Sequence, residues 1–386
     1  MDKAKIISGL KQYTMVIVLV LITLFFSWRT DGSMLLPQNV NNLIAQNAYV
    51  FVLATGMLLC ILTGGNIDLS VGSVVCFVGA IGGQLMVNKK LPVFAAILAM
   101  LVMGIIIGIW QGIWIAYVRI PPFIVTLAGM LMFRGLSNVV LNGLTIAPMP
   151  DSYLQLFNFY IADVLNGKTI NLTCMLIGVI AIVIYVLLSL RTLANRKKKG
   201  QQTEAMTPFL FKRVIVSLVI LAFTYKLAQY KGVPNILIWV LIIVLIYWYI
   251  TSKTTVGRHF YAVGGNEKAA ALSGINTNRV YFLAYVNMSM LAAVAGMVTI
   301  ARLNSANPTA GTNYEMDAIA SCFIGGASAY GGIGTVPGVI VGAILMGVIN
   351  LGMSIMGVDA NWQRVVKGGV LLAAVIFDVV SKKKSR

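Results

Sequence analysis

Charged residues are scarce in this chain. Only 10% of its 386 residues are Asp, Glu, Lys or Arg, whereas soluble globular proteins carry about 25%. The acidic residues are fewest, with 11 against 29 basic ones. This composition excludes a soluble globular protein. Hydrophobic residues make up 59% of the chain, and apolar runs of about 20 residues recur along it, which predicts an all-α polytopic membrane protein.

Side chains that carry enzyme chemistry are also few. His259 is the single histidine, and the four cysteines (Cys60, Cys76, Cys174 and Cys322) lie in apolar runs without the spacing of a disulfide framework or metal site. No H-E-x-x-H or G-x-S-x-G motif occurs. The segment Asn166-Gly-Lys-Thr169 resembles the end of a phosphate-binding loop, but Ala162 replaces the required glycine. We therefore predict no catalytic site, no metal and no cofactor.

Basic residues give the chain a net charge of +18, and their positions along the chain indicate the origin of this excess. We place the N-terminus in the cytoplasm and predict a retained first span, because no small-residue cleavage site precedes Trp28. The cytoplasmic segments then hold 19 of the 29 Lys and Arg residues, including the cluster from Arg191 to Arg213. This is the positive-inside pattern and not a nucleic-acid-binding surface. The twelve predicted segments are 13–28, 43–62, 69–87, 92–118, 122–141, 170–190, 214–229, 233–251, 282–302, 316–331, 337–356 and 361–380.

Two glycine-rich stretches, 63–72 and 324–338, interrupt this pattern. Glycine at such density indicates close backbone packing or a broken helix, and broken helices in membranes line a cavity or lie buried in protein. We therefore predict about ten to twelve transmembrane helices, including broken or half-spanning ones. The two stretches have the same predicted orientation, which suggests a parallel internal repeat, and two tight helix contacts are the alternative. The predicted pore or gate residues are Asn66, Asp68, Ser70, Gly325, Gly326, Gly331 and Gly332, with helix capping as the alternative for Asp68.

Several polar residues fall inside or beside apolar runs. Arg134 lies deep in its span, and for it we favour an ion pair or backbone carbonyl contacts over substrate contact. Glu315 and Asp317 either cap a helix or contact an external protein that docks there. Arg364 and Lys367 are interpreted as structural or outward-facing.

The polar stretch 257–279 is predicted to form one short capped helix in the cytoplasm. Asn266 is a suitable N-cap, Glu267 follows in the first turn, and Gly274 supplies a stop. Ala270 and Ala271 would give this helix a thin face for another protein to contact. The predicted contact residues are Gly264, Gly265, Asn266, Glu267, Ala269, Ala270, Leu272, Ser273, Gly274 and Ile275.

Four separated motifs resemble the monosaccharide permeases of bacterial ABC importers, in the ribose, xylose and galactose branch. They are Asn66-Ile-Asp-Leu-Ser-Val-Gly72, Pro122–Met130 with Arg134-Gly135, Tyr261–Asn266 with Ala270–Ile275, and Asp317–Ala320 with Gly325-Gly326 and Gly331-Gly332. The chain looks most similar to the xylose and multiple-monosaccharide permeases. Residues 191–232 then correspond to an insertion, with a basic cytoplasmic loop and an extra span, that ribose-type permeases lack.

The resemblance implies a role for the chain. It would be a single permease domain over 1–386 in the bacterial cytoplasmic (inner) membrane, with both termini in the cytoplasm. Two permease subunits, expected to be identical, would form the pore, a sugar-binding protein would dock outside, and a tandem ATPase would dock inside on the coupling loop 257–279. The alternatives are an ABC permease for a nucleoside or amino acid, a secondary sugar carrier, and a membrane-embedded enzyme.

Overall fold

The computed structural model describes the backbone of residues 3–201 and 205–383, and it describes side chains there except for residues 3–14, 377 and 381–383. These residues form helices joined by loops, with no β-strand among them. The prediction of an all-α polytopic membrane protein is confirmed. The chain divides into two compact units, one made of residues 1–34, 43–158 and 236–386 and the other of residues 35–42 and 159–235.

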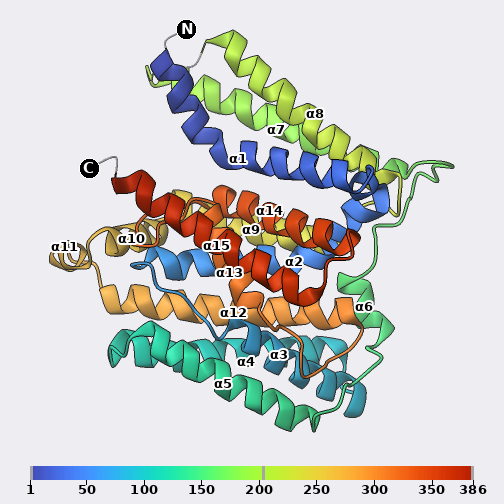
Figure 1. The fold of residues 1–386 in the computed structure, drawn as a ribbon, viewed down its shortest axis with the longest axis vertical. Coiled ribbons are helices and arrows are strands. Elements are labelled where there is room, and N and C mark those ends of the chain that lie inside the picture. The colour runs from blue at the N-terminus through green and yellow to red at the C-terminus, as the bar shows by residue number, and fades with distance from the viewer. Residues whose placement is uncertain (1–2, 202–204, 384–386) are drawn as a thin grey trace. The chain divides into compact units, whose positions relative to one another are not determined.

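The larger unit holds most of the helices (Figure 1). Its elements are α1 (Lys3–Arg29), most of α2 (Pro37–Leu62), α3 (Val71–Gly83) with a π-helical turn (Gln84–Asn88), α4 (Val93–Gly112) with a second π-helical turn (Ile113–Tyr117), α5 (Pro122–Leu141), α6 (Asp151–Phe157), α9 (Asn235–Lys253), α10 (Thr255–Gly265), α11 (Glu267–Leu272), α12 (Thr277–Leu303), α13 (Tyr314–Ile324), α14 (Val336–Ile355) and α15 (Ala360–Lys383). α10 and α11 lie at the same end of this unit as the end of α15.

The smaller unit holds the long helices α7 (Leu172–Lys198) and α8 (Met206–Ala228). α8 lies within the predicted insertion 191–232. The loop before α7 is organised by Asp163, which accepts five hydrogen bonds, from the backbones of Leu165, Gly167, Leu172 and Thr173 and from the Thr173 hydroxyl. Desolvation alone would raise the pKa of Asp163, but these bonds lower it to about 2.

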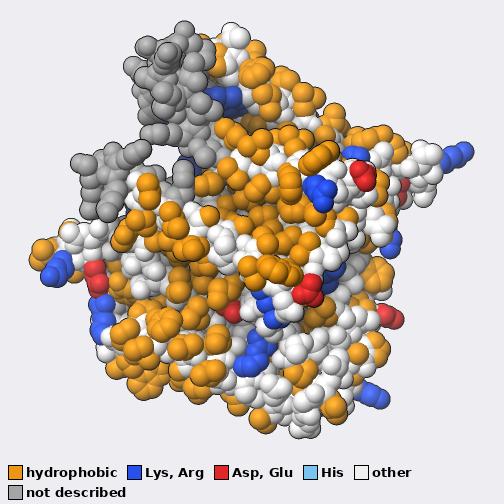
Figure 2. All heavy atoms as spheres, in the orientation of Figure 1, with side chains coloured by type: hydrophobic (Ala, Val, Ile, Leu, Met, Phe, Trp, Pro, Cys, Tyr) orange, Lys and Arg blue, Asp and Glu red, His pale blue; other side chains and the backbone are white. Residues whose placement is uncertain are grey.

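Nine helical segments in the described part of the chain are long and apolar enough to cross a membrane. They cover α2, α3, α4, α5, α7, α8, α9, α12 and α14, the π-helical turns included. The other three predicted segments also contain helices. In the described part of the chain, α1 contributes the apolar helix Met15–Arg29, α15 is not among the nine segments, and α13 has 11 residues. Figure 2 shows many apolar side chains on the visible surface, as lipid exposure requires.

α12 lies in the core of the larger unit. Its contacts with α2 and α3 show in which direction each of these two helices runs relative to α12. The Cys60 thiol in α2 donates to the carbonyl of Ala284 in α12, and Gly56 packs near Met288 and Leu291, so α2 runs antiparallel to α12. In α3, Gly79 packs against Ile300, one turn beyond the contact of Val75 with Gly296, so α3 runs parallel to α12.

Two short helices, α3 and α13, begin at the same level inside the larger unit. A Cβ atom added to Gly72 would lie 2.2 Å from the carbonyl oxygen of Gly311, and one added to Gly65 would lie 1.9 Å from that of Ala329. The segments 65–72 and 311–329 therefore run side by side in opposite directions. Each short helix is preceded by a non-helical stretch, 63–70 and 304–313.

The two glycine-rich stretches have the same orientation, as predicted. The helices before them, α2 and α13, run parallel, since Tyr49 and Ala54 contact Asp317 and Cys322. The helix α14 then runs antiparallel to α13, as α3 does to α2, and the parallel repeat itself stays a prediction. α3 and α13 have opposite directions, and we call them the two half-helices because each begins at a non-helical stretch inside the unit. The boundary of the predicted segment 316–331 differs, because α13 ends at Ile324 and residues 325–335 form a loop.

Candidate functional site

Acidic side chains gather where the two half-helices begin. Asp68, Glu315 and Asp317 are 0%, 8% and 2% exposed. The Glu315 carboxylate lies against the first turn of α3, since a Cβ atom on Gly72 would approach Glu315 Oε2 to 2.4 Å. Helix N-termini carry a partial positive charge and unpaired backbone N–H groups, which favours carboxylates there. The position of Glu315 thus has an electrostatic explanation inside the protein.

Asp68 holds the turn that leads into α3. Its Oδ1 atom accepts hydrogen bonds from the backbone N–H and the hydroxyl of Ser70, at 2.8 and 2.6 Å. Ser70 is the N-cap residue of α3 without capping it through its side chain, and its hydroxyl accepts a 2.6 Å bond from Gln111 Nε2 in α4. Asp68 and Ser70 are fully buried, so in this conformation they fix the shape of the broken helix and do not line an open path.

Asn66, the third polar residue predicted for the pore, lies at the start of the same stretch. Its amide donates to the backbone carbonyl and the hydroxyl of Thr63, at 3.2 and 3.3 Å. These bonds close the turn at the end of α2. Gln111 was not predicted, although a glutamine within a long apolar run is a usable signal, because an amide in a membrane interior needs polar partners.

Asp317 lies in the first turn of α13 and has two partners from other helices. Tyr49 in α2 donates its hydroxyl to Asp317 Oδ2 at 2.6 Å. Lys367 in α15 places its ammonium 3.0 Å from Oδ1. The predicted docking of an external protein on Glu315 and Asp317 is not supported, because both side chains are buried and Asp317 is already paired. The structural interpretation of Lys367 agrees with its ion pair.

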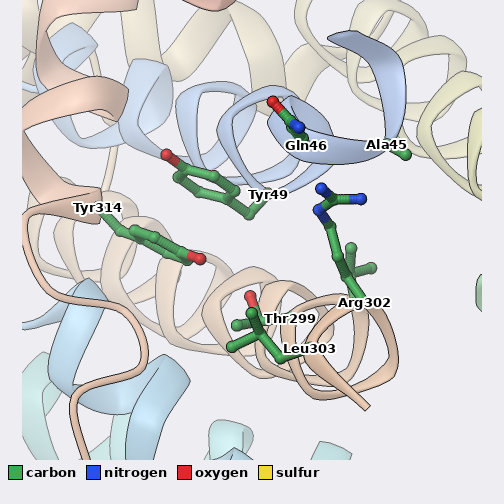
Figure 3. A pocket seen from close by; sticks show the side chains of 8 residues that line it. Ala45, Gln46, Tyr49, Thr299, Arg302, Leu303 and Tyr314 are labelled. Atoms are coloured by element: carbon green, nitrogen blue, oxygen red, sulfur yellow. The ribbon is translucent and has the colours of Figure 1, made fainter. Parts of the chain in front are cut away.

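A small cavity lies beside Tyr49, the residue that donates a hydrogen bond to Asp317 (Figure 3). Its volume is about 50 Å³, and it is lined by Ala45, Gln46, Tyr49, Val298, Thr299, Arg302, Leu303 and Tyr314. The rings of Tyr49 and Tyr314 stack, with centroids 3.5 Å apart and an interplanar angle of 13°. Ligand pockets usually enclose about 300–1,000 Å³, so this space does not hold a sugar in the conformation observed.

Arg134 in α5 reaches the stretch that precedes α13. Its guanidinium donates to the carbonyls of Pro308 and Ala310, at 3.1 and 2.7 Å. The prediction of backbone carbonyl contacts is confirmed. Without Arg134 these two carbonyls would lose partners in a region where non-helical backbone has few alternatives.

The predicted gate glycines are placed at close backbone contacts, with one exception. A Cβ atom on Gly331 would lie 2.4 Å from the Cα atom of Gly64, and one on Gly325 would lie 2.5 Å from the carbonyl oxygen of Gly338. Gly332 has φ +69°, and a Cβ atom added there would lie 2.9 Å from the backbone nitrogen of Gly265. Gly326 has φ +87° but open space around it, so this position needs glycine for its backbone conformation alone.

The polar stretch 257–279 forms two helices where one was predicted. α10 ends at Gly265, and α11 starts at Glu267, with Asn266 as the residue between them. Asn266 caps α11, because its side-chain oxygen accepts from the Ala269 N–H at 3.0 Å. Gly274 has φ +83° and ends α11, as predicted, and the Ile275 N–H bonds back to the Ala270 carbonyl at 3.1 Å.

The exposed face of α11 also differs from the prediction. Ala270 is 5% exposed and packs inward, whereas Leu272 is 90% exposed. The residues that face outward together with Leu272 are Lys268, Ala269, Ala271, Ser273 and Gly274. Leu272 is the most exposed large apolar side chain in the part of the chain that the structure describes.

Arg119, in the loop between α4 and α5, anchors α11. Its guanidinium bonds to Glu267 Oε1 at 2.8 Å, to the Thr277 hydroxyl at 3.1 Å and to the Asn278 side chain. The Tyr281 hydroxyl donates to the other carboxylate oxygen of Glu267 at 3.1 Å. Desolvation alone would raise the pKa of Glu267, but these hydrogen bonds hold it below its usual value.

The helical bundle and its nine apolar segments define a polytopic helical membrane protein. The family model described as "Branched-chain amino acid transport system / permease component" matches residues 39–155 and 153–375. The chain belongs to this family of transport permeases.

Two kinds of relatives cover nearly the whole chain. It is 37% identical to the xylose transport system permease protein XylH of Haemophilus influenzae, over 97% of this chain and 98% of that protein. The XylH protein of Escherichia coli K12 is also 37% identical, over 98% of this chain and 95% of that protein. The ribose import permease protein RbsC of E. coli K12 is 32% identical, over 96% of this chain and 94% of that protein. No solved structure matches the chain.

Proposed function

We propose that this chain is the pore-forming permease subunit of an ABC importer that moves a monosaccharide into the cell across the bacterial cytoplasmic membrane. The observation that carries the proposal is the similarity to the xylose permeases along almost the entire chain. The importer would be completed by a tandem ATPase, an external sugar-binding protein and a second permease subunit, most simply a second copy of this chain. ATP hydrolysis belongs to the ATPase.

The orientation follows from charge. α11 and the end of α15 lie at one end of the larger unit (Figure 1), and basic residues such as Lys268, Arg279 and Lys382 belong to this end. The positive-inside rule then assigns this end to the cytoplasm. The ATPase would meet α11, with Leu272 as the anchor.

The half-helices supply the moving part of the mechanism. An importer alternates between outward-open and inward-open states, and each partner shifts the balance only if it binds one state better than the other. The described conformation encloses no sugar-sized space beside Tyr49 and Tyr314. We expect the path to open when the segments 63–70 and 325–335 move, because their close glycine contacts allow discrete alternative packings.

The test is reconstitution of the permease with its ATPase in proteoliposomes, with sugar-loaded binding protein outside. We expect uptake of labelled xylose, ribose, galactose or glucose that requires both partners and ATP hydrolysis. Uptake that needs no ATPase and follows an ion gradient would identify a secondary carrier. Uptake of leucine or a nucleoside, with none of the sugars carried, would place the chain on another branch of the ABC permeases.

A further inference from the structure

Three stretches of backbone meet beside the α10–α11 pair. They are the end of α2 (62–65), the end of α10 (261–265) and the glycine-rich turn (331–334). The N–H of Gly332 donates to the carbonyl of Leu62 at 3.1 Å. The Tyr261 hydroxyl donates to the carbonyl of Gly334 at 2.8 Å. The first bond joins the glycine-rich turn to the end of α2, and the second joins α10 to that turn.

Gly264 lies at the centre of this junction. A Cβ atom there would lie 1.6 Å from the carbonyl oxygen of Leu62 and 2.6 Å from the backbone nitrogen of Gly332. Both contacts are with backbone, which cannot rotate away as a side chain can. The adjacent Gly265 has nothing within 4 Å of the same added atom. The difference shows that close approach, and not a general need for glycine at the end of α10, fixes the residue type at 264.

We propose that Gly264 is the positioning residue through which α11 drives the pore. The inference rests on the proposed function, in which the ATPase moves α11. A displacement of α10 at Gly264 must displace the Leu62 and Gly332 backbones, because no flexible side chain lies between them to absorb it. Leu62 leads into the stretch 63–70 and so to α3, whereas Gly332 belongs to the turn that follows α13. One contact point thus reaches both half-helices.

The experiment compares Gly264→Ala with Gly265→Ala in the complete importer in nanodiscs, with Gly368→Ala as a control for the effect of the substitution in an exposed helix. Gly368 also has nothing within 4 Å. Three quantities are measured: co-purification of the ATPase, ATP turnover stimulated by sugar-loaded binding protein, and sugar transported per ATP hydrolysed. A methyl group that pushes the backbones apart should lower the sugar transported per ATP by about tenfold at Gly264, with the ATPase still bound. At Gly265 the loss should be several-fold smaller.

Equal coupling in Gly264→Ala and Gly265→Ala would overturn the proposal and leave the permease function intact. Failure of the unmodified chain to bind an ATPase or import sugar would instead refute the function. Tyr261→Phe keeps the test decisive if Gly264→Ala fails to fold. It removes only the hydroxyl that holds Gly334, so we expect a several-fold loss of sugar per ATP, whereas Tyr249→Phe, whose side chain is 58% exposed, should leave this ratio unchanged. An unchanged ratio in Tyr261→Phe would argue against the junction.

Discussion

Lys367 and Asp317 form an ion pair inside the larger unit, with the Lys367 ammonium 3.0 Å from Asp317 Oδ1. The Asp317 side chain is 2% exposed and that of Lys367 is 21% exposed. The pair joins α15 to the first turn of α13, where a carboxylate is also favoured by the helix N-terminus. Without Lys367, the buried carboxylate would keep only the hydrogen bond from Tyr49 as a side-chain partner in another helix.

Lys367→Met should therefore destabilise the protein. Breaking a buried pair by removing one partner costs about 3–5 kcal/mol, and the partial exposure of Lys367 places this case at the lower end. The apparent melting temperature in detergent should fall clearly, and Lys367→Met with Asp317→Asn should recover most of the loss. Arg364→Met, three residues away, is the control, because its hydrogen bond to Asn361 is long, at 3.5 Å. Equal melting temperatures for all four proteins would show that the pair contributes nothing.

Arg134→Met tests the support of the stretch 304–313. The substitution leaves the buried Ala310 carbonyl without the guanidinium, at a cost of about 1–3 kcal/mol for an unsatisfied buried group, whereas the Pro308 carbonyl keeps the thiol of Cys76. We expect faster proteolysis or hydrogen exchange in residues 304–313, with α5 itself unchanged. Asn138→Ala, in the same helix, removes only a local bond to the Arg134 carbonyl and should leave the exchange of 304–313 as it was. Unchanged exchange in Arg134→Met would contradict the structural role.

The sequence predicted the helical class and most spans because apolar runs and flanking charges are local signals. The span 122–141 coincides with α5 (Pro122–Leu141), since proline before the helix and Asn142 after it both mark boundaries. The antiparallel pairing of α3 and α13 was not predictable in the same way. It depends on contacts such as Gly72 with Gly311, between positions far apart in the chain, and glycine density alone does not say which segments meet.

In the candidate site, too, the features that depend on nearby residues were predicted, and those that depend on residues distant in sequence were not. Asn266 and Gly274 were predicted correctly as the ends of α11, because capping depends on neighbours within a few residues. The exposure of Leu272 and the burial of Ala270 were not predicted, because a helix of six residues is too short to show a periodic pattern that would reveal its inner face. The partners of Asp317 were missed because Tyr49 and Lys367 reach it from helices distant in sequence.

Leu272→Ala should weaken the association of the ATPase. If Leu272 is the anchor of α11, its truncation should cost about 1–2 kcal/mol of binding free energy, or roughly tenfold in affinity. Binding of the sugar-loaded binding protein at the opposite side should not change. Ala270→Arg should also lose the ATPase, but through disruption of the loop, because Ala270 is buried. The two are separated by protease sensitivity of the stretch 257–279, which should rise in Ala270→Arg alone. Full affinity in Leu272→Ala would remove this side chain from the interface.

Cysteine labelling tests the orientation of the chain. The four native cysteines are buried, so an impermeant maleimide should give a low background on intact cells. Gln201 and Asn276 are exposed and lie between helices, and the positive-inside rule places both in the cytoplasm. Gln201→Cys and Asn276→Cys should therefore be protected in intact cells and react in inverted vesicles. Val164→Cys is the opposite control, since its loop lies between predicted spans on the outer side and its side chain is 77% exposed. Labelling of either predicted cytoplasmic position from outside would reverse the orientation, and α11 could then no longer meet a cytoplasmic ATPase.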